Sequence, residues 1–97
     1  MTNRIEVELL GVLQKAANKK TMRLEFDGVV AVKDVILKLT SLFSPEFKQA
    51  LIDPELNDPR PNVLVLLNGK EINVLNGLDT RVKNGDELVL IPVSHGG

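Results

Sequence analysis

The 97-residue sequence contains no cysteine. Disulfides, thiolate nucleophiles, iron–sulfur clusters and thiolate zinc sites are therefore excluded, because each of them requires cysteine sulfur. Tryptophan and tyrosine are also absent, phenylalanine occurs three times, and the net charge is −1. A protein that binds nucleic acid normally has a basic face or aromatic stacking residues. We therefore expect no direct contact with nucleic acid.

The sequence also lacks long apolar runs. No stretch approaches the length of a membrane-spanning helix, and Met1-Thr2-Asn3-Arg4 lacks the apolar run of a signal peptide. We expect a cytoplasmic protein without membrane contact, folded as one domain over residues 1–97. The acidic residues show no metal-ligand spacing, and solvated faces explain them, so no metal site is expected.

Two segments near the N-terminus alternate apolar and polar residues. Their apolar positions are Ile5, Val7 and Leu9, and Met22, Leu24 and Phe26. This period of two predicts two strands, each with one face in water, paired antiparallel. Gly11 ends the first strand, residues 12–20 form a connection with some helical character, and Asp27-Gly28 closes the second.

The next segment repeats apolar residues at helical spacing. These residues are Val32, Val35, Ile36, Leu39, Leu42 and Phe43. The pattern predicts an amphipathic helix across the inner face of the sheet, although Ala31 offers no capping oxygen at its start. Ser44-Pro45-Glu46 predicts the start of a second, short helix that ends near Ile52. The proline-rich residues 53–62 are expected to form a surface loop.

Two uninterrupted apolar runs, residues 63–67 and 88–91, predict strands covered on both faces, and the second is expected in the middle of the sheet. Asn68-Gly69 predicts a hairpin into a short strand that contains Ile72 and Val74. Residues 78–82 are expected to form one helical turn. The predicted fold class is α+β: a mixed sheet of four or five strands packed on one main helix.

One main helix covers only one face of such a sheet. We assign Val65, Leu67, Leu88 and Leu90 to the covered face, which leaves Leu64, Leu66, Val89 and Ile91 on the other. An apolar cluster of this kind on a soluble protein usually marks a binding surface, so we interpret it as a partner-binding patch. A dimer contact, or a register that buries the second set, is the alternative.

Pro92 has no N–H for the sheet ladder, so strand pairing is expected to fail there and residues 93–97 to project as a tail. The tail ends in Gly96-Gly97 and a carboxylate. Two glycines end a random chain about once in 200 cases, so the pair alone is weak evidence of function, and frayed termini are common.

Longer motifs make the ending more specific. They are Asn68-Gly69-Lys70-Glu71-Ile72-Asn73, Leu75-Asn76-Gly77-Leu78-Asp79-Thr80, Lys83-Asn84-Gly85-Asp86-Glu87 and Ile91-Pro92-Val93-Ser94-His95-Gly96-Gly97. Together with the element order, they resemble the ubiquitin-like sulfur carriers of the β-grasp fold. This family includes the ubiquitin-related modifiers, the small subunit of molybdopterin synthase (MoaD) and the thiazole-synthesis carrier (ThiS).

The resemblance implies that Gly97 carries the chemistry. An adenylating enzyme of the ubiquitin-activating type would use ATP to activate its carboxylate, and a persulfide enzyme would supply sulfur to form a thiocarboxylate. Gly96 and His95 would thread into that enzyme, where a Cβ at Gly96 would obstruct a narrow channel. The protein would then be a carrier, not an enzyme, and would bind no cofactor of its own.

His95 has two interpretations. A lone histidine invites an acid/base role, but no serine–histidine–acid set accompanies it, so a recognition contact or no role is favoured. The ending His-Gly-Gly resembles the ubiquitin-related modifiers, whose thiocarboxylate serves tRNA wobble-uridine thiolation and whose glycine forms conjugates with lysines of target proteins.

Other residues resemble the small subunit of molybdopterin synthase. Asn76-Gly77-Leu78-Asp79 and Pro92-Val93 suit that subunit, although Ile91 stands where its first proline would be. Three hypotheses therefore remain, in descending order: a carrier that passes sulfur to a tRNA-thiolating enzyme and modifies proteins, the partner of a molybdopterin synthase large subunit, and a β-grasp interaction module with idle terminal glycines.

Overall fold

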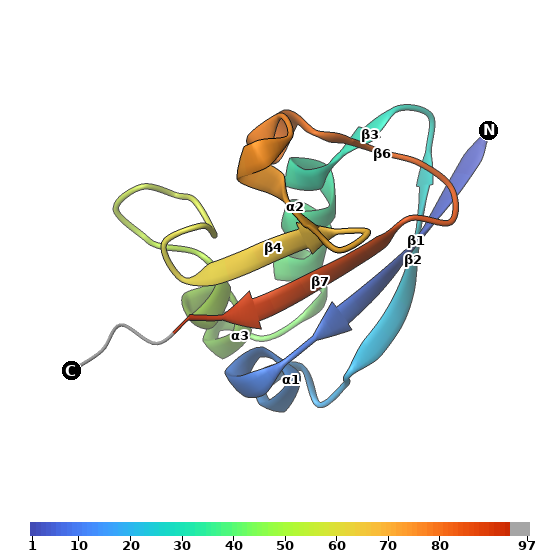
Figure 1. The fold of residues 1–97 in the computed structure, drawn as a ribbon. Helices are drawn as coiled ribbons and strands as arrows, with labels where there is room; N and C mark the ends of the chain where they lie inside the picture. The colour runs from blue at the N-terminus through green and yellow to red at the C-terminus, as the bar shows by residue number, and fades with distance from the viewer. Residues whose placement is uncertain (94–97) are drawn as a thin grey trace.

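The computed structural model describes residues 1–93, which form a five-stranded mixed sheet with helices on one side (Figure 1). The sheet has the order β2-β1-β7-β4-β5. Its strands are β1 (Thr2–Leu9), β2 (Thr21–Asp27), β4 (Val63–Leu67), β5 (Lys70–Glu71) and β7 (Glu87–Pro92). As predicted, β7 lies in the middle, parallel to β1 and antiparallel to β4.

The alternating patterns of the first two strands fold as expected. β1 and β2 pair antiparallel, with Ile5 opposite Leu24. The apolar residues of β1 are buried, whereas Arg4 is exposed and Glu6 is half-buried on the other face. Burial of one face fixes the register, because a shift by one residue would turn the whole apolar set toward water.

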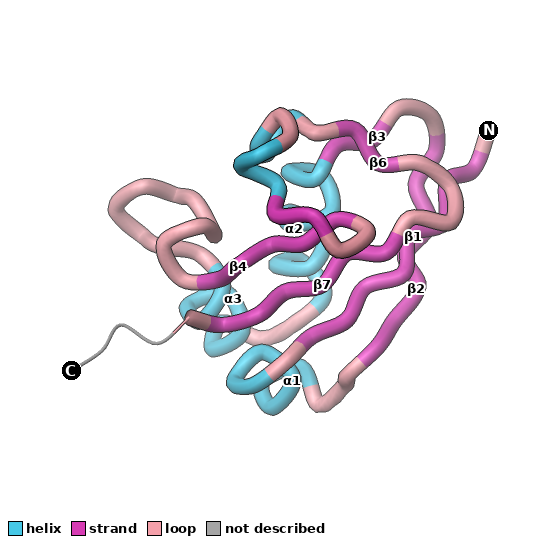
Figure 2. The backbone as a smooth tube through the Cα atoms, in the orientation of Figure 1, coloured by secondary structure: helices cyan, strands magenta, loops and turns pink. Residues whose placement is uncertain are grey.

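Helix α2 (Val32–Leu42) covers the inner face of the sheet, as its periodicity predicts (Figure 2). With 11 residues it is the longest helix of the described part of the chain, and no helix there is long and apolar enough to cross a membrane. Its first turn is held by Asp34, whose carboxylate accepts the N–H of Ala31 at 2.8 Å. The acid at the third helical position thus satisfies the backbone N–H of the N-cap residue, which is one half of a capping box; alanine has no side-chain oxygen to supply the other half.

Two shorter helices close one end of the core. α1 (Gly11–Ala17) lies in the connection after β1 and buries Leu13 completely. α3 (Pro45–Leu51) begins where the Ser-Pro-Glu signal predicts it, and Ser44 Oγ accepts the N–H of Phe47 at 3.3 Å. The ring of Phe47 is fully buried and packs on Phe43, with centroids 4.9 Å apart.

The predicted short strand through Ile72 and Val74 is wrong. After the hairpin at Asn68-Gly69, β5 spans only two residues, and Ile72–Val74 form a 3₁₀ turn. The Glu71 carboxylate accepts the N–H of Asn73, and the N–H of Leu75 bonds to the carbonyl of Ile72, which closes a turn. The turn directs Ile72 into the core, whereas Val74 is exposed.

The helical turn expected over residues 78–82 is correct only at its start. Gly77–Asp79 form a 3₁₀ turn, but Arg81–Val82 form a strand, β6, which pairs with β3 (Val30–Ala31). The N–H of Val32 then bonds to the carbonyl of Thr80 at 2.9 Å. This small second sheet therefore ties the start of α2 to the segment that precedes β7.

Candidate functional site

The residues interpreted as a partner-binding patch lie together on the outer face of β4 and β7. Leu64 pairs with Ile91, and Leu66 pairs with Val89. All four are partly exposed, and we call them the outer patch. The inward assignment of Val65, Leu67, Leu88 and Leu90 is confirmed, because each is at most 7 % exposed. The binding role of the outer patch stays a prediction.

Acidic side chains surround the outer patch. Strand register places Glu8 beside Val89, Glu71 beside Leu66, and Glu6 beside Glu87. Arg23 neutralises Glu6 at 2.7 Å, but within residues 1–93 neither Glu8 nor Glu87 has a cation at ion-pair distance. An apolar centre with an acidic rim fits a partner surface that is apolar in the middle and basic around it.

β7 leads from this face into the tail, and its last residues are paired more fully than expected. Pro92 is still opposite Val63, and the N–H of Val93 donates to the carbonyl of Asn62 at 3.0 Å. The prediction that pairing fails at Pro92 and leaves Val93 free is therefore wrong. The hydrogen-bonding pattern gives the reason. Alternate residues of β7 bond to opposite neighbours, and position 92 faces the side of β1, which has already ended at Leu9.

Gly11 packs against this end of β7. It adopts φ +55°, a conformation that side chains disfavour, and a Cβ built on it would lie 3.3 Å from Cγ of Pro92. The N–H of the preceding Leu10 donates to the carbonyl of Leu90 at 3.2 Å. Pro92 and Val93, which we call the root of the tail, thus lie between the start of α1 on one side and Asn62 on the other.

The other end of β7 is fixed by a buried carboxylate. Asp86 is 7 % exposed; its Oδ1 accepts the side-chain amide of Asn68 at 3.0 Å, and its Oδ2 accepts the N–H of Lys83 at 2.9 Å. Asn68 Oδ1 in turn accepts the N–H of Glu87 at 2.9 Å. These bonds satisfy a charge that would otherwise be costly to bury, and they fix β7 at its start.

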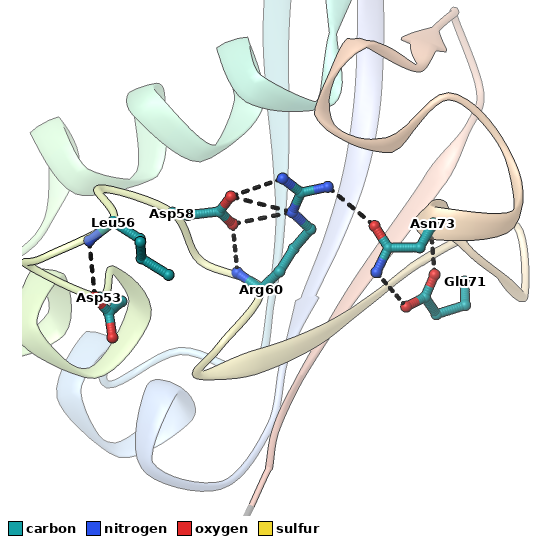
Figure 3. A network of polar contacts seen from close by, with 6 residues as sticks. All are labelled: Asp53, Leu56, Asp58, Arg60, Glu71 and Asn73. Carbon is teal, nitrogen blue, oxygen red and sulfur yellow. Dashed lines mark hydrogen bonds and ion pairs between the residues drawn. The ribbon is translucent and has the colours of Figure 1, made fainter.

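An arginine holds the loop that supplies Asn62 (Figure 3). The guanidinium of Arg60 contacts the Asp58 carboxylate at 2.7 Å and Asn73 Oδ1 at 3.0 Å, and Asn73 bonds to Glu71. The hydrogen bond from Arg60 lowers the pKa of Asp58, and the same pair raises the pKa of Arg60. The network joins the loop of residues 53–62 to the turn after β5. Its arginine, Arg60, lies two residues before Asn62 in the sequence.

The sequence-predicted tail residues His95, Gly96 and Gly97 lie outside the described residues. Within residues 1–93, no group of three or more histidine, aspartate or glutamate side chains is placed to hold a metal ion. Sequence reasoning missed Asn62 and Arg60, and it read Gly11 only as a strand breaker. No sequence signal marks Asn62, because it acts through its backbone carbonyl, which every residue has.

Comparison with known proteins decides the family. The family model described as Urm1 (Ubiquitin related modifier) matches residues 4–97. The chain belongs to the ubiquitin-related modifier family. This match includes β7, the outer patch and the Gly-Gly ending, so the family of ubiquitin-like sulfur carriers and modifiers suggested by the motifs is confirmed.

Individual relatives agree with this assignment. The chain is similar to the ubiquitin-related modifier 1 homolog of Dictyostelium discoideum, with 28% identity over 97% of this chain and 99% of the relative. It is also similar to the crystal structure of SAMP1 from Haloferax volcanii, with 26% identity, 98% and 100% coverage and a TM-score of 0.82. The β-grasp fold expected for a ubiquitin-related modifier is thus confirmed.

A third similarity concerns the molybdopterin alternative. A putative molybdopterin converting factor, subunit 1, from Pyrococcus furiosus has a TM-score of 0.75 to this ubiquitin-related modifier, with 18% identity, and covers 95% of this chain and 99% of its own. At that identity the likeness establishes a shared fold alone.

Proposed function

We propose that this ubiquitin-related modifier carries sulfur on the carboxyl carbon of Gly97 and donates it for tRNA wobble-uridine thiolation, and that the same carbon forms isopeptide bonds with lysines. The family match over residues 4–97 supports the proposal. The observation that carries it furthest is the fixing of β7 at both ends, by Asp86 and by Asn62, directly before the tail.

The chemistry requires that the carboxylate be activated first, because a carboxylate is a poor electrophile. An adenylating enzyme of the ubiquitin-activating type would join it to AMP from ATP and release pyrophosphate. A persulfide sulfur would attack the carbonyl and displace AMP, and cleavage of the resulting S–S bond by a second thiol would leave a thiocarboxylate. This chain supplies the reacting carbon, and the partner enzymes supply ATP and catalysis.

The ending of the chain suits that role. Gly96 and Gly97 have no Cβ, so they fit a narrow channel and reach extended conformations without strain. We propose His95 as a recognition contact at the mouth of the channel. Residues 1–97 would then form one ubiquitin-like domain with a C-terminal tail.

The outer patch is the proposed docking surface for the activating enzyme. Ile91 lies on the same strand as the root of the tail, so an enzyme that covers the patch is positioned to receive the residues that follow. The acidic rim implies arginine or lysine side chains around the matching surface of that enzyme. The tRNA-thiolating enzyme would receive the sulfur in a later, separate complex.

Intact-mass measurement tests the carrier role. The chain is incubated with its cognate activating enzyme, ATP and a persulfide donor, and its mass is expected to rise by the difference between sulfur and oxygen. Deletion of Gly97 should abolish the change, whereas Ser94→Ala, in the same tail, should preserve it. An unchanged mass with active enzyme would contradict the proposal and leave only an interaction module.

Capture of the acceptor distinguishes the two sulfur-carrier hypotheses. The thiocarboxylated chain is offered to a tRNA-thiolating enzyme and to a molybdopterin synthase large subunit from the same organism, and complex formation and loss of sulfur are measured. We expect transfer with the first. Transfer with the second alone would make the chain the small subunit of molybdopterin synthase.

A further inference from the structure

The outermost long strand of the sheet, β2, has one edge that pairs with nothing in residues 1–93. Among the described residues β2 bonds only to β1, and no other strand, helix or loop there pairs with its outer edge (Figure 2). Such an edge presents free N–H and C=O groups and is a template for another strand. Natural proteins usually shorten, charge or cover these edges; β2 is not shortened, since it runs for seven residues, and its charges are of both signs, at Arg23, Glu25 and Asp27.

The register identifies which backbone groups face outward. The N–H of Leu9 bonds to the carbonyl of Lys20, and the N–H of Gly28 bonds to the carbonyl of Met1. Antiparallel pairs alternate between bonded and non-bonded positions, so the even residues of β2 bond to β1. The odd residues direct their N–H and C=O groups to the free edge. They are Thr21, Arg23, Glu25 and Asp27.

We propose that two copies of this chain pair antiparallel through β2, with the twofold axis at Leu24. In this register Arg23 of each copy lies opposite Glu25 of the other, and Thr21 lies opposite Asp27. Opposite charges directly across a strand pair stabilise it, and like charges destabilise it. The contact is isologous, with the same surface used twice, as in most dimers.

Neighbouring registers are less favourable. A shift by one residue would set the outer face of one copy against the inner face of the other. A shift by two would place Arg23 opposite Arg23, or Glu25 opposite Glu25. Of these registers, only the one centred on Leu24 places Arg23 of each copy opposite Glu25 of the other.

The inner side of the same edge is also self-complementary. Met22 and Phe26 are only partly buried, and both lie at the margin of the core. The proposed register sets Met22 of one copy against Phe26 of the other, a sulfur–aromatic contact that covers apolar surface on both. A second copy of the chain supplies both the opposite charges and the apolar partners that this edge requires, whereas an unrelated peptide need not supply either.

The proposed pairing also gives a closed dimer, to which further copies cannot add in the same way. The opposite edge of the sheet is β5, which has only two residues before the chain turns away. A dimer formed through β2 therefore offers no second long edge for further growth. β7, the root of the tail and the outer patch lie on the far side of β1 and stay accessible in both copies.

Sedimentation equilibrium of the full chain from micromolar to millimolar concentration tests the proposal. We expect a reversible monomer–dimer equilibrium that Glu25→Arg shifts toward monomer, because Arg23 of each copy then faces a second arginine across the strand pair. The double variant Arg23→Glu, Glu25→Arg should restore the dimer. Arg4→Gln is the matched control, since it removes the intrachain Arg4–Glu25 pair, 3.0 Å in the structure, and leaves the edge unchanged.

Amide hydrogen exchange gives a readout specific to this edge. Raising the concentration should slow exchange about tenfold at Thr21, Arg23, Glu25 and Asp27. Exchange at Met22, Leu24 and Phe26 should be slow at every concentration, because β1 already protects them.

Three results would overturn the proposal: a monomer at every concentration, a dimer unaffected by Glu25→Arg, or a dimer lost on Leu66→Asp, which would place the contact on the outer patch. Protection that appears when a partner enzyme is added, and not with concentration, would assign the edge to that enzyme instead. None of these results bears on thiocarboxylate formation at Gly97, which is measured separately.

Discussion

Gly11 occupies a position where both the backbone and the surroundings oppose a side chain. Its φ is +55°, and a Cβ would lie 3.3 Å from Pro92 Cγ. Gly28 offers a matched comparison, because its φ is +75° and nothing lies within 4 Å of an added Cβ. Alanine substitutions at these two positions therefore distinguish the effect of backbone strain, which both share, from the effect of displacing Pro92, which only Gly11→Ala causes.

We expect Gly11→Ala and Gly28→Ala each to reduce the free energy of unfolding by about 1–2 kcal/mol, because a left-handed conformation disfavours a Cβ. Only Gly11→Ala should also slow adenylation of the tail, since it displaces Pro92. Urea unfolding measures the first effect, and pyrophosphate release by the activating enzyme measures the second. Equal adenylation rates for both variants would show that the Gly11–Pro92 contact does not position the tail.

Asp58 and Arg60 give a prediction on pH. The folded-state pKa of Asp58 is lowered, first by the hydrogen bond from Arg60. A lowered pKa means that the pair stabilises the fold above the ordinary pKa of aspartate, and that this contribution is lost as the pH falls through the lowered value. Asp58→Asn should therefore reduce stability at pH 7, by up to about 1 kcal/mol for a partly exposed pair.

The difference between wild type and Asp58→Asn should shrink in acid, where both lack the charge. Urea midpoints measured from neutral to acid pH would reveal this convergence. Asp27→Asn is the control, because Asp27 has no ion pair within residues 1–93. Parallel pH profiles for wild type and Asp58→Asn would contradict the role of the pair.

At the scale of elements, strands β4 and β7 expose one apolar set and bury the other. We expect Leu66→Asp to weaken binding to the activating enzyme at least about tenfold, which is the effect of substituting a residue at the centre of an interface, and to leave the fold intact. Val65→Asp, one residue away on the inner face, should unfold the protein, because Val65 is 1 % exposed.

Titration calorimetry with the activating enzyme and circular dichroism of both variants would check this pair. If Leu66→Asp melts the protein, the outer face of β4 contributes more to folding than to binding. If it binds as wild type does, the outer patch is not the docking surface.

Elements with a clear period were predictable from sequence. β1, β2, α2 and α3 each carry a repeating apolar pattern or a capping signal in their own residues. β3 and β6 have two residues each, too few for a period, and exist because segments distant in sequence meet. The short strand through Ile72 and Val74 was predicted from the hairpin signal at Asn68-Gly69, but capping by Glu71 turns the chain there, so local hydrogen bonding ends the strand after two residues.

The candidate site divides in the same way. Alternation along β4 and β7 identified the outer patch, because the side-chain period of a strand needs no knowledge of neighbours. The contacts of Asn62, Gly11 and Arg60 were not predictable, since each depends on which segments meet near Pro92 and on backbone groups that all residues share.

For the whole molecule, the net charge of −1 conceals an uneven distribution. Glutamates lie around the outer patch at positions 6, 8, 71 and 87, and of these only Glu6 has an ion pair within the described residues. Complementary charge mainly accelerates association, and salt screens it over about 10 Å at 0.1 M.

We therefore expect the association rate with the activating enzyme to fall as ionic strength rises. Replacing Glu8 and Glu87 by glutamine should lower the rate several-fold at low salt and flatten its salt dependence. Glu46→Gln, on α3 away from the patch, should change neither. Stopped-flow measurements at several salt concentrations would check this, and identical slopes for all variants would contradict a role for the rim.

The parallel pairing of β1 and β7 in the middle of the sheet has a mechanical consequence. In the lysine conjugates proposed above, traction applied through the tail would act along β7, and it would have to shear the ladders to β1 and β4 together instead of peeling one bond at a time. An unfolding motor that grips the attached target should therefore stall when it reaches this domain. Resistance of that kind would let the carrier be released whole and used again.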